Sequence, residues 1–285
     1  MRIAITGAGG MLGRALFDAV INRHEVVALP REVLDVRDAD AVRDCLAEAR
    51  CEVVVNCAAF TDVDGCESRV EEAMAINGEG PRNLAAACAR QGAALVHIST
   101  DYVFAGDAGR SYEEDDLPRP CNAYGRSKLA GEQAVRATLD RHCIVRTSGL
   151  FGLHGPSFVR AILAAAQTRD TLRVVRDQVS VPTYVRDLAD ALRLLVERES
   201  RGTWHVTATS EGVPWSDFAR QLLEAAGRTQ VQVIDVTTAE LGRPAPRPAF
   251  SVLAPRAWER AGLAPLPPPL DGLRRFLREW EASAR

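Results

Sequence analysis

The chain has 285 residues, of which 47% are hydrophobic and 26% charged, and its net charge is −3. This length predicts one large α/β domain or such a domain with a smaller appendage. The near-neutral charge argues against a nucleic-acid or anionic-membrane partner. No apolar run approaches a bilayer-spanning length, and the start MRIAITGAGG lacks the features of a signal peptide, so a cytoplasmic protein is expected. Seven cysteines without a Cys-x-x-Cys spacing, and five scattered histidines, predict buried thiols and no metal site.

Short β-branched runs alternate with longer helical patterns over residues 1–150. The runs are continuously apolar, as in parallel strands that are covered on both faces. The segments between them carry apolar residues at spacings of three and four, which predicts helices. This alternation predicts a doubly wound parallel sheet of the Rossmann-like α/β class, which would form a dinucleotide-binding domain. The predicted strands are Ile3–Thr6, Val26–Leu29, Val53–Asn56, Leu95–Thr100 and Ile144–Thr147, and the predicted helices cover residues 12–22, 39–49, 70–91 and 127–138.

The pattern changes after about residue 150. Residues 151–285 are expected to form a smaller α/β portion that binds substrate, with residues 172–200 or so packing back on the first domain. Short strands are predicted at Trp204–Val206 and Val231–Ile234, on either side of a helix over residues 215–226. A proline-rich connection, residues 243–269, precedes a last helix; its apolar side chains argue for packing rather than disorder.

A glycine triplet, Gly7-x-x-Gly10-x-x-Gly13, follows the first predicted strand and opens a helix. Such glycines permit a tight turn and let backbone amides approach a pyrophosphate, so a dinucleotide site is predicted. The second strand ends without the carboxylate that would hold an NAD ribose. Arg31 can instead face a 2′-phosphate, and Asp35 can meet the adenine. NADPH is therefore the expected cofactor, with NADH as an alternative.

A hydroxyl and a Tyr-x-x-x-Lys pair follow in chain order. Thr100 ends the fourth predicted strand, and Tyr124 and Lys128 stand four apart on a helix, where they share one face. Ligands bind at the carboxyl ends of such strands. Alone, the pair could equally be a half-buried tyrosine and a solvated lysine without a catalytic role. The prediction of a catalytic pair therefore depends on the glycine loop and Thr100.

The order of these three features resembles the short-chain dehydrogenase/reductase superfamily. Longer matches resemble the family of dTDP-4-dehydrorhamnose reductases across nearly the whole chain. The segments that carry this resemblance are NCAAFTDVD from Asn56, STDYVFAG from Ser99, YGRSKLAGE from Tyr124, DQVSVPT from Asp177 and RPAFSVL from Arg247.

The resemblance implies NADPH-dependent reduction of the 4-keto group of dTDP-4-dehydro-L-rhamnose to dTDP-L-rhamnose. Tyr124 would donate the proton, and Lys128 would lower the tyrosine pKa and hold the nicotinamide ribose. Thr100 would donate to the carbonyl oxygen, and Asp101 would contact a sugar hydroxyl. The implied cofactor residues are Gly7, Gly10, Met11, Leu12, Gly13, Arg31, Asp35, Val36, Ala58, Ala59, Phe60 and Lys128, and the implied substrate residues are Val63, Thr100, Asp101, Tyr124 and Gly149.

One position departs from the family pattern. Gly149 follows Arg-Thr-Ser where the family commonly has a tryptophan that covers the sugar, and Phe151 is a candidate replacement. Other readings therefore stay open: a reductase of another dTDP-4-keto-6-deoxyhexose, a sugar-nucleotide epimerase, a dehydratase, or a non-enzymatic NADP-binding subunit resembling that of methionine adenosyltransferase. A dehydratase would need a second carboxylate after Asp101, where Tyr102 stands. The chain is expected to be a monomer or a homodimer.

Overall fold

A six-stranded parallel sheet forms the centre of the computed structural model, which describes residues 1–283. Its strand order is β2-β1-β3-β4-β5-β10, so the order reverses between β1 and β3. The carboxyl ends of the strands at such a reversal form a crevice where ligands bind. The predicted class, an α/β fold with a doubly wound parallel sheet, is confirmed. The strands are β1 (Arg2–Thr6), β2 (Glu25–Leu29), β3 (Val53–Asn56), β4 (Ala94–Thr100), β5 (His142–Thr147) and β10 (Gly202–His205).

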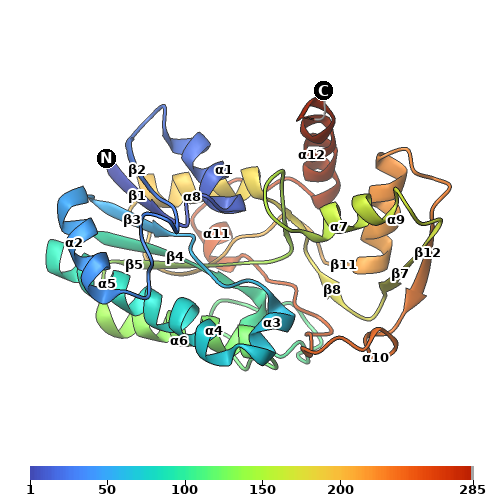
Figure 1. Ribbon diagram of the computed structural model, residues 1–285, viewed down its shortest axis with the longest axis horizontal. Coiled ribbons are helices and arrows are strands. Elements are labelled where there is room, and N and C mark those ends of the chain that lie inside the picture. The colour runs from blue at the N-terminus through green and yellow to red at the C-terminus, as the bar shows by residue number, and fades with distance from the viewer. Residues whose placement is uncertain (284–285) are drawn as a thin grey trace.

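Helices cover both faces of this sheet (Figure 1). On one face, α1 (Met11–Val20) packs against α8 (Val185–Glu197), and their apolar sides join the larger core cluster. On the other face, α2 (Ala39–Ala49), α5 (Gly80–Gln91) and α6 (Ala123–Thr138) lie side by side over a second cluster. The strand residues alternate between these two clusters, which explains why the sequence runs are continuously apolar.

Two sequence predictions needed correction. The segment 70–91 is α4 (Val70–Met74), a π-helical turn over Ala75–Glu79 and then α5. Pro81 lies at the start of α5, and its missing N–H removes one bond from the helical ladder, which accounts for the interruption. The strand predicted at Trp204–Val206 is present as β10, but it is the outer strand of the central sheet, parallel to β5, and not part of the smaller C-terminal region where it was expected.

Residues 150–283 otherwise build a smaller α/β region from short sheets and helices. Its pairs are β6 (Leu150–Phe151) with β9 (Thr183–Tyr184), β7 (Thr171–Val175) with β12 (Gln232–Val236), and β8 (Val179–Ser180) with β11 (Val213–Pro214). Its helices are α7 (Phe158–Ala165), α9 (Trp215–Ala225), α10 (Thr238–Leu241), α11 (Arg256–Arg260) and α12 (Pro269–Ser283). Because β10 completes the central sheet, a domain division at residue 150 stays a prediction.

The segment between α10 and α11 returns to the first half of the chain. Asn122 Nδ2, just before α6, donates to the Pro246 carbonyl at 2.9 Å, and Leu253 forms a β-bridge with Tyr112. We call residues 243–255 the C-terminal arm. Ser251 of this arm donates its hydroxyl to Asp101, so the arm reaches the carboxyl edge of the sheet, where β4 ends.

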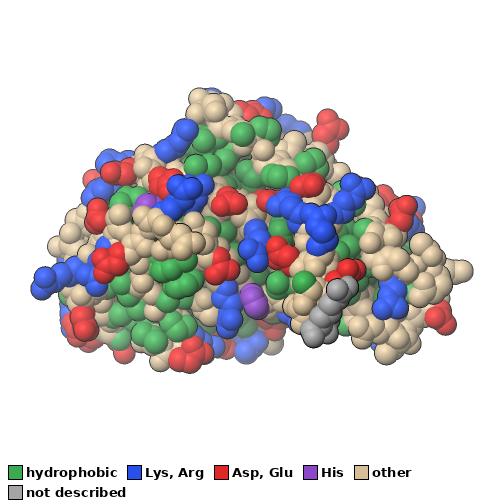
Figure 2. Space-filling model, turned by 90° about the horizontal axis from the view of Figure 1, so that it is seen from above, with side chains coloured by type: hydrophobic (Ala, Val, Ile, Leu, Met, Phe, Trp, Pro, Cys, Tyr) green, Lys and Arg blue, Asp and Glu red, His purple; other side chains and the backbone are tan. Residues whose placement is uncertain are grey.

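The surface carries both signs of charge. On the face shown in Figure 2, acidic and basic side chains are interspersed, in keeping with the small net charge. None of the helices within residues 1–283 is long and apolar enough to span a membrane. Over the same range, no cluster of three metal-ligating side chains was found, and all seven cysteines are free thiols.

Candidate functional site

A cavity of about 910 Å³ opens at the β1–β3 reversal, beside the glycine loop. Gly7 has φ +64° and lies against the next strand end, since a Cβ there would stand 2.7 Å from the Ala58 nitrogen. Gly10 donates its N–H to the Gly7 carbonyl at 2.9 Å, and α1 begins directly after it. The glycine loop thus places the N-terminus of α1 at the cavity, in a backbone path that a side chain at Gly7 would obstruct. A helix N-terminus in this position is what pyrophosphate binding requires.

The cavity brings together about half of the predicted cofactor residues. Its lining includes Gly7, Gly10, Arg31, Asp35, Val36, Ala58 and Ala59. In the described part of the chain, Met11, Leu12, Gly13, Phe60 and Lys128 lie outside this lining. The Phe60 backbone is held nearby through a pair of hydrogen bonds with the Asn77 side chain, at 2.8 and 3.0 Å.

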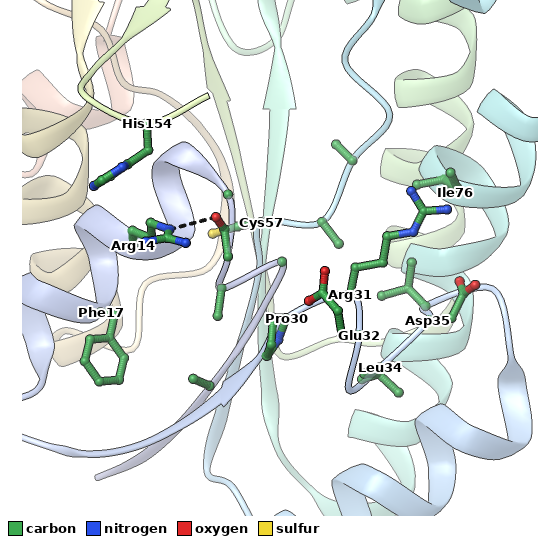
Figure 3. A pocket seen from close by; sticks show the side chains of 18 of the residues that line it. Arg14, Phe17, Pro30, Arg31, Glu32, Leu34, Asp35, Cys57, Ile76 and His154 are labelled. Carbon is green, nitrogen blue, oxygen red and sulfur yellow. Dashed lines mark hydrogen bonds between the residues drawn. The ribbon is translucent and has the colours of Figure 1, made fainter. Parts of the chain in front are cut away.

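Several lining residues were missed by sequence reasoning. Arg14 and His154 lie on one side of the cavity and Arg31 and Asp35 on the other (Figure 3). Arg14 is one turn into α1, and its Nε donates to the Gly9 carbonyl at 2.9 Å. His154 comes from the loop after β6, about 140 residues later, and no local pattern links it to the glycine loop.

Contacts with Arg37 favour the ionised form of the Asp35 carboxyl. Arg37 donates Nε to Asp35 Oδ1 at 3.0 Å, and its backbone N–H donates to the same oxygen at 3.0 Å. The Arg37 guanidinium lowers the pKa of Asp35 to about 2. Arg37 is paired with Asp35, whereas Arg14 and Arg31, which also line the cavity, form no ion pair within residues 1–283. Either of these two guanidinium groups is therefore placed to meet an anionic group in the cavity.

Gly13→Ala is expected to weaken dinucleotide binding and lower thermal stability. A Cβ at Gly13 would stand 2.3 Å from the Gly7 carbonyl oxygen and 2.7 Å from the Ala8 Cα, so α1 must move away from the loop. We expect about a tenfold or greater loss of NADPH affinity, since overpacking of this kind costs about 1–3 kcal/mol. Gly78→Ala is the control, because Gly78 has no positive φ and a Cβ there would stand 3.5 Å or more from its nearest neighbours. Titration calorimetry measures both, and unchanged affinity in Gly13→Ala would contradict the assignment.

The structure places Thr100 and Tyr124 together at the carboxyl end of β4. Thr100 is buried at the last position of this strand, and Tyr124 lies in the first turn of α6. Burial raises the pKa of Tyr124, and the Thr100 hydroxyl partly offsets that rise. The phenol therefore carries its proton at neutral pH, which is the form that a general acid needs.

Lys128 is buried one turn along α6. Its Nζ donates to the Ile98 carbonyl of β4 at 2.7 Å. Burial lowers the pKa of Lys128 to about 8, while Glu132 and Cys57 act to raise it, so the amine is mostly protonated at neutral pH. Since the pKa of Tyr124 is raised overall, a lowering of it by Lys128 stays a prediction.

Asp101 points into the protein. Its Oδ1 accepts from the Thr100 hydroxyl at 2.9 Å, and its Oδ2 accepts from Ser251 and Ser180. Asp101 as a whole is 2% exposed. The structure thus gives Asp101 protein partners in place of the sugar hydroxyl that the family resemblance implies.

An ion pair lies buried behind these groups. Glu132 of α6 accepts from Arg146 of β5 through both of its oxygens, at 2.9 and 2.8 Å, and from Ser99 of β4 at 2.6 Å. Arg146 also approaches His205 Nε2 at 3.4 Å. Burial lowers the pKa of His205 to about 3, so this imidazole is neutral and accepts from Arg146. The pair ties α6, and with it Tyr124 and Lys128, to β5, and the Ser99 hydrogen bond ties α6 to β4, the strand that ends at Thr100.

Gly149 lies against an aromatic ring from another element. It has φ +56°, and a Cβ there would stand 3.2 Å from Trp215 Cη2 at the start of α9. Phe151 does not take the place of the absent tryptophan, because it is buried against Tyr184, Phe218 and Phe276. Val63, the remaining predicted substrate residue, is partly exposed at the start of α3 (Val63–Ser68), which packs against α6.

A dinucleotide cavity next to a threonine, a tyrosine and a lysine at one sheet edge is the arrangement of short-chain dehydrogenases and reductases. The chain is an oxidoreductase of this class. Residues 1–282 match the family described as RmlD substrate binding domain, and the chain belongs to this family.

Named relatives agree with the family. The chain is 46% identical to a dTDP-4-dehydrorhamnose reductase of Streptomyces griseus, over 93% of this chain and 89% of that one. It is 41% identical to a dTDP-4-keto-6-deoxy-D-glucose reductase of Streptomyces niveus, over 93% and 92%. The structure of a Bacillus anthracis dTDP-4-dehydrorhamnose reductase in complex with NADP superposes with a TM-score of 0.95, at 37% identity, over 98% of this chain and 99% of that one. The resemblance drawn from the sequence motifs is confirmed.

Proposed function

We propose that the protein reduces the 4-keto group of dTDP-4-dehydro-L-rhamnose, with NADPH, to give dTDP-L-rhamnose. The observation that carries this is the placement of Tyr124 beside Thr100 at the carboxyl end of β4, at the same sheet edge as the dinucleotide cavity. The similarity to the Bacillus anthracis reductase that binds NADP supports both the cofactor and the reaction.

The residues present fit a dinucleotide phosphate. Gly7 and Gly10 would hold the pyrophosphate at the N-terminus of α1, Arg31 would hold the 2′-phosphate, and Ala58 and Ala59 leave room for a flat ring. When bound, NADPH supplies the hydride that forms the new C–H bond at the sugar C4.

The chain supplies the proton and the orientation. As the carbonyl double bond breaks, Tyr124 transfers its phenolic proton to the oxygen and becomes a phenolate. Lys128, held on β4 by the Ile98 carbonyl, stabilises that phenolate as a nearby cation. Thr100, at the end of β4, would be a hydrogen-bond partner of the same oxygen. The phenolate regains its proton from solvent.

The test is to follow NADPH oxidation with a panel of dTDP-4-keto-6-deoxyhexoses and to identify each product. We expect dTDP-4-dehydro-L-rhamnose to be consumed fastest, with one NADPH oxidised per sugar. No oxidation with any sugar would contradict a reductase. Conversion of a sugar without net NADPH loss would indicate an epimerase instead.

A second candidate is a reductase of another dTDP-4-keto-6-deoxyhexose. Two observations favour this candidate. Gly149, with Trp215 beside it, stands where the family commonly has a tryptophan, and the chain is similar to the Streptomyces niveus enzyme. It predicts that dTDP-4-keto-6-deoxy-D-glucose outcompetes the rhamnose precursor in a mixed assay. A cytoplasmic location and a monomeric or homodimeric state are proposed with either candidate.

Arg31→Ala is expected to weaken NADPH binding about 10–100-fold while leaving NADH binding nearly unchanged. A hydrogen bond to a charged group contributes about 1.5–3 kcal/mol, and only NADPH carries the 2′-phosphate. Arg43→Ala is the matched control, because Arg43 lies on α2 and pairs with Asp40 and Asp44. Dissociation constants for both cofactors measure the effect. An equal loss of NADPH and NADH affinity would show that Arg31 contacts a part that both cofactors share, and not the 2′-phosphate.

A further inference from the structure

The Asp101 carboxylate gathers three hydroxyl groups from three segments. Thr100 of β4 lies 2.9 Å from Oδ1, while Ser251 of the C-terminal arm and Ser180 of β8 lie 2.5 and 3.4 Å from Oδ2. Ser180 and Ser251 are 3.4 Å apart and both are buried. Neither serine touches the dinucleotide cavity, so their contacts point to a role at Asp101.

The hydrogen count at Thr100 limits what this residue can do. A threonine hydroxyl has one hydrogen to donate and two lone pairs. Thr100 Oγ1 accepts the Tyr102 backbone N–H at 3.2 Å, and its own hydrogen points to Asp101 when that carboxyl is ionised. In this state Thr100 has no hydrogen left for a substrate oxygen. When Asp101 carries a proton on Oδ1, it donates to Thr100, and the Thr100 hydrogen is released toward the substrate.

We propose that Ser180 and Ser251 are positioning residues that hold Asp101 against Thr100, and that protonation of Asp101 sets whether Thr100 donates to the substrate oxygen. This inference rests on the proposed function, because it concerns the oxygen that is reduced. The proton on Asp101 is not consumed. It fixes the direction of one hydrogen bond, and Tyr124 remains the group that gives up a proton.

The surroundings of Asp101 place its titration in an accessible range. Burial raises the pKa of Asp101 to about 6, and the hydroxyls of Ser251, Thr100 and Ser180 hold it below what burial alone would give. The titratable groups nearby are the phenols of Tyr102 and Tyr124, whose pKa values are both raised by burial. The charged group nearby is Arg247 of the C-terminal arm, which lies beside Tyr102. The 2′-phosphate of NADPH also titrates at about pH 6, so a transition there belongs to Asp101 when Asp101→Asn abolishes it.

The direction of the pH effect follows. Below about pH 6 Asp101 is protonated, Thr100 donates to the developing alkoxide, and reduction is faster. As the pH rises through about 6 that donation is lost and the rate of the chemical step falls. Tyr124, with its raised pKa, keeps its proton on both sides of the transition.

The experiment is the single-turnover rate of NADPH oxidation against pH for wild type, Ser251→Ala and Asp101→Asn. Loss of the Ser251 hydroxyl removes a hydrogen bond that favours the charged carboxylate, so the transition should move up by about 1–2 pH units. In Asp101→Asn the amide oxygen stays with the two serines, and the amide nitrogen donates to Thr100. This variant mimics the protonated state and should show no transition near pH 6.

Ser148→Ala is the control, because Ser148 is an equally buried serine that donates to the Val181 carbonyl at 2.8 Å. It should keep the wild-type transition. An unmoved transition in Ser251→Ala, or a wild-type transition retained in Asp101→Asn, overturns the inference, and either variant decides it if the other does not fold. A wild type that turns over without a transition near pH 6 also overturns it. If the wild-type protein oxidises no NADPH at any pH, the proposed function itself is contradicted.

Discussion

Tyr124→Phe is expected to lower kcat for ketone reduction about 10²–10⁴-fold, the range that a positioned general acid contributes. The phenylalanine keeps the ring and its edge-on contact with Tyr102, at 5.9 Å between ring centres, and removes only the hydroxyl. NADPH affinity should stay within about twofold, since Tyr124 lies outside the lining of the dinucleotide cavity. Stopped-flow oxidation of NADPH measures the chemical step directly.

Tyr102→Phe is the matched control for that variant. It removes the hydroxyl of the other tyrosine of the same ring pair and leaves Thr100 and Tyr124 in place. We expect it to retain more than about a tenth of the wild-type rate. Equal losses in the two variants would contradict Tyr124 as the specific proton donor, and so would full activity in Tyr124→Phe.

Glu132→Gln is expected to destabilise the fold by about 3–5 kcal/mol, because it leaves the Arg146 guanidinium buried beside an uncharged partner. Arg146 is 1% exposed and Glu132 is fully buried. Burial alone would raise the pKa of Glu132, but the hydrogen bonds and charge of Arg146 outweigh it and leave the pKa below its ordinary value. Because the folded-state pKa is lowered, this stabilisation is complete above the unfolded-state pKa of about 4.3. It is lost as the pH falls through the folded-state value.

Denaturant unfolding of Glu132→Gln measures the cost, with Arg136→Ala as the control. Arg136 bonds the same carboxylate at 3.0 Å, but its side chain is 35% exposed, so its removal should cost at most about 1 kcal/mol. The double variant Glu132→Gln with Arg146→Met should recover part of the loss, since no buried charge then lacks a partner. A cost below about 1 kcal/mol for Glu132→Gln alone would contradict a structural role for this pair.

The buried parallel strands and the glycine loop could be predicted from the sequence. Continuous apolar runs identify the buried parallel strands, and the glycine triplet identifies the loop that meets the cavity, because both signals lie within a few consecutive residues. The position of β10 was not predictable in the same way. Its four residues give a short strand pattern, but the choice of β5 as its partner depends on long-range packing.

The same distinction applies to the site. Thr100, Tyr124 and Lys128 follow from motif order, whereas His154, Ser180 and Trp215 come from later segments that only the folded chain brings near. Glu132 lies within a quoted motif, yet its pairing with Arg146 depends on the contact between α6 and β5. Motifs thus locate the reacting groups, and the tertiary fold supplies the groups that orient them.

The most direct test of the central claim is transfer of deuterium from NADPH labelled at the transferable C4 position to dTDP-4-dehydro-L-rhamnose. The account predicts dTDP-L-rhamnose with one deuteron at the sugar C4 and one equivalent of oxidised cofactor, detected by mass spectrometry and NMR. Product without deuterium at C4, or no product while NADPH remains intact, would contradict it.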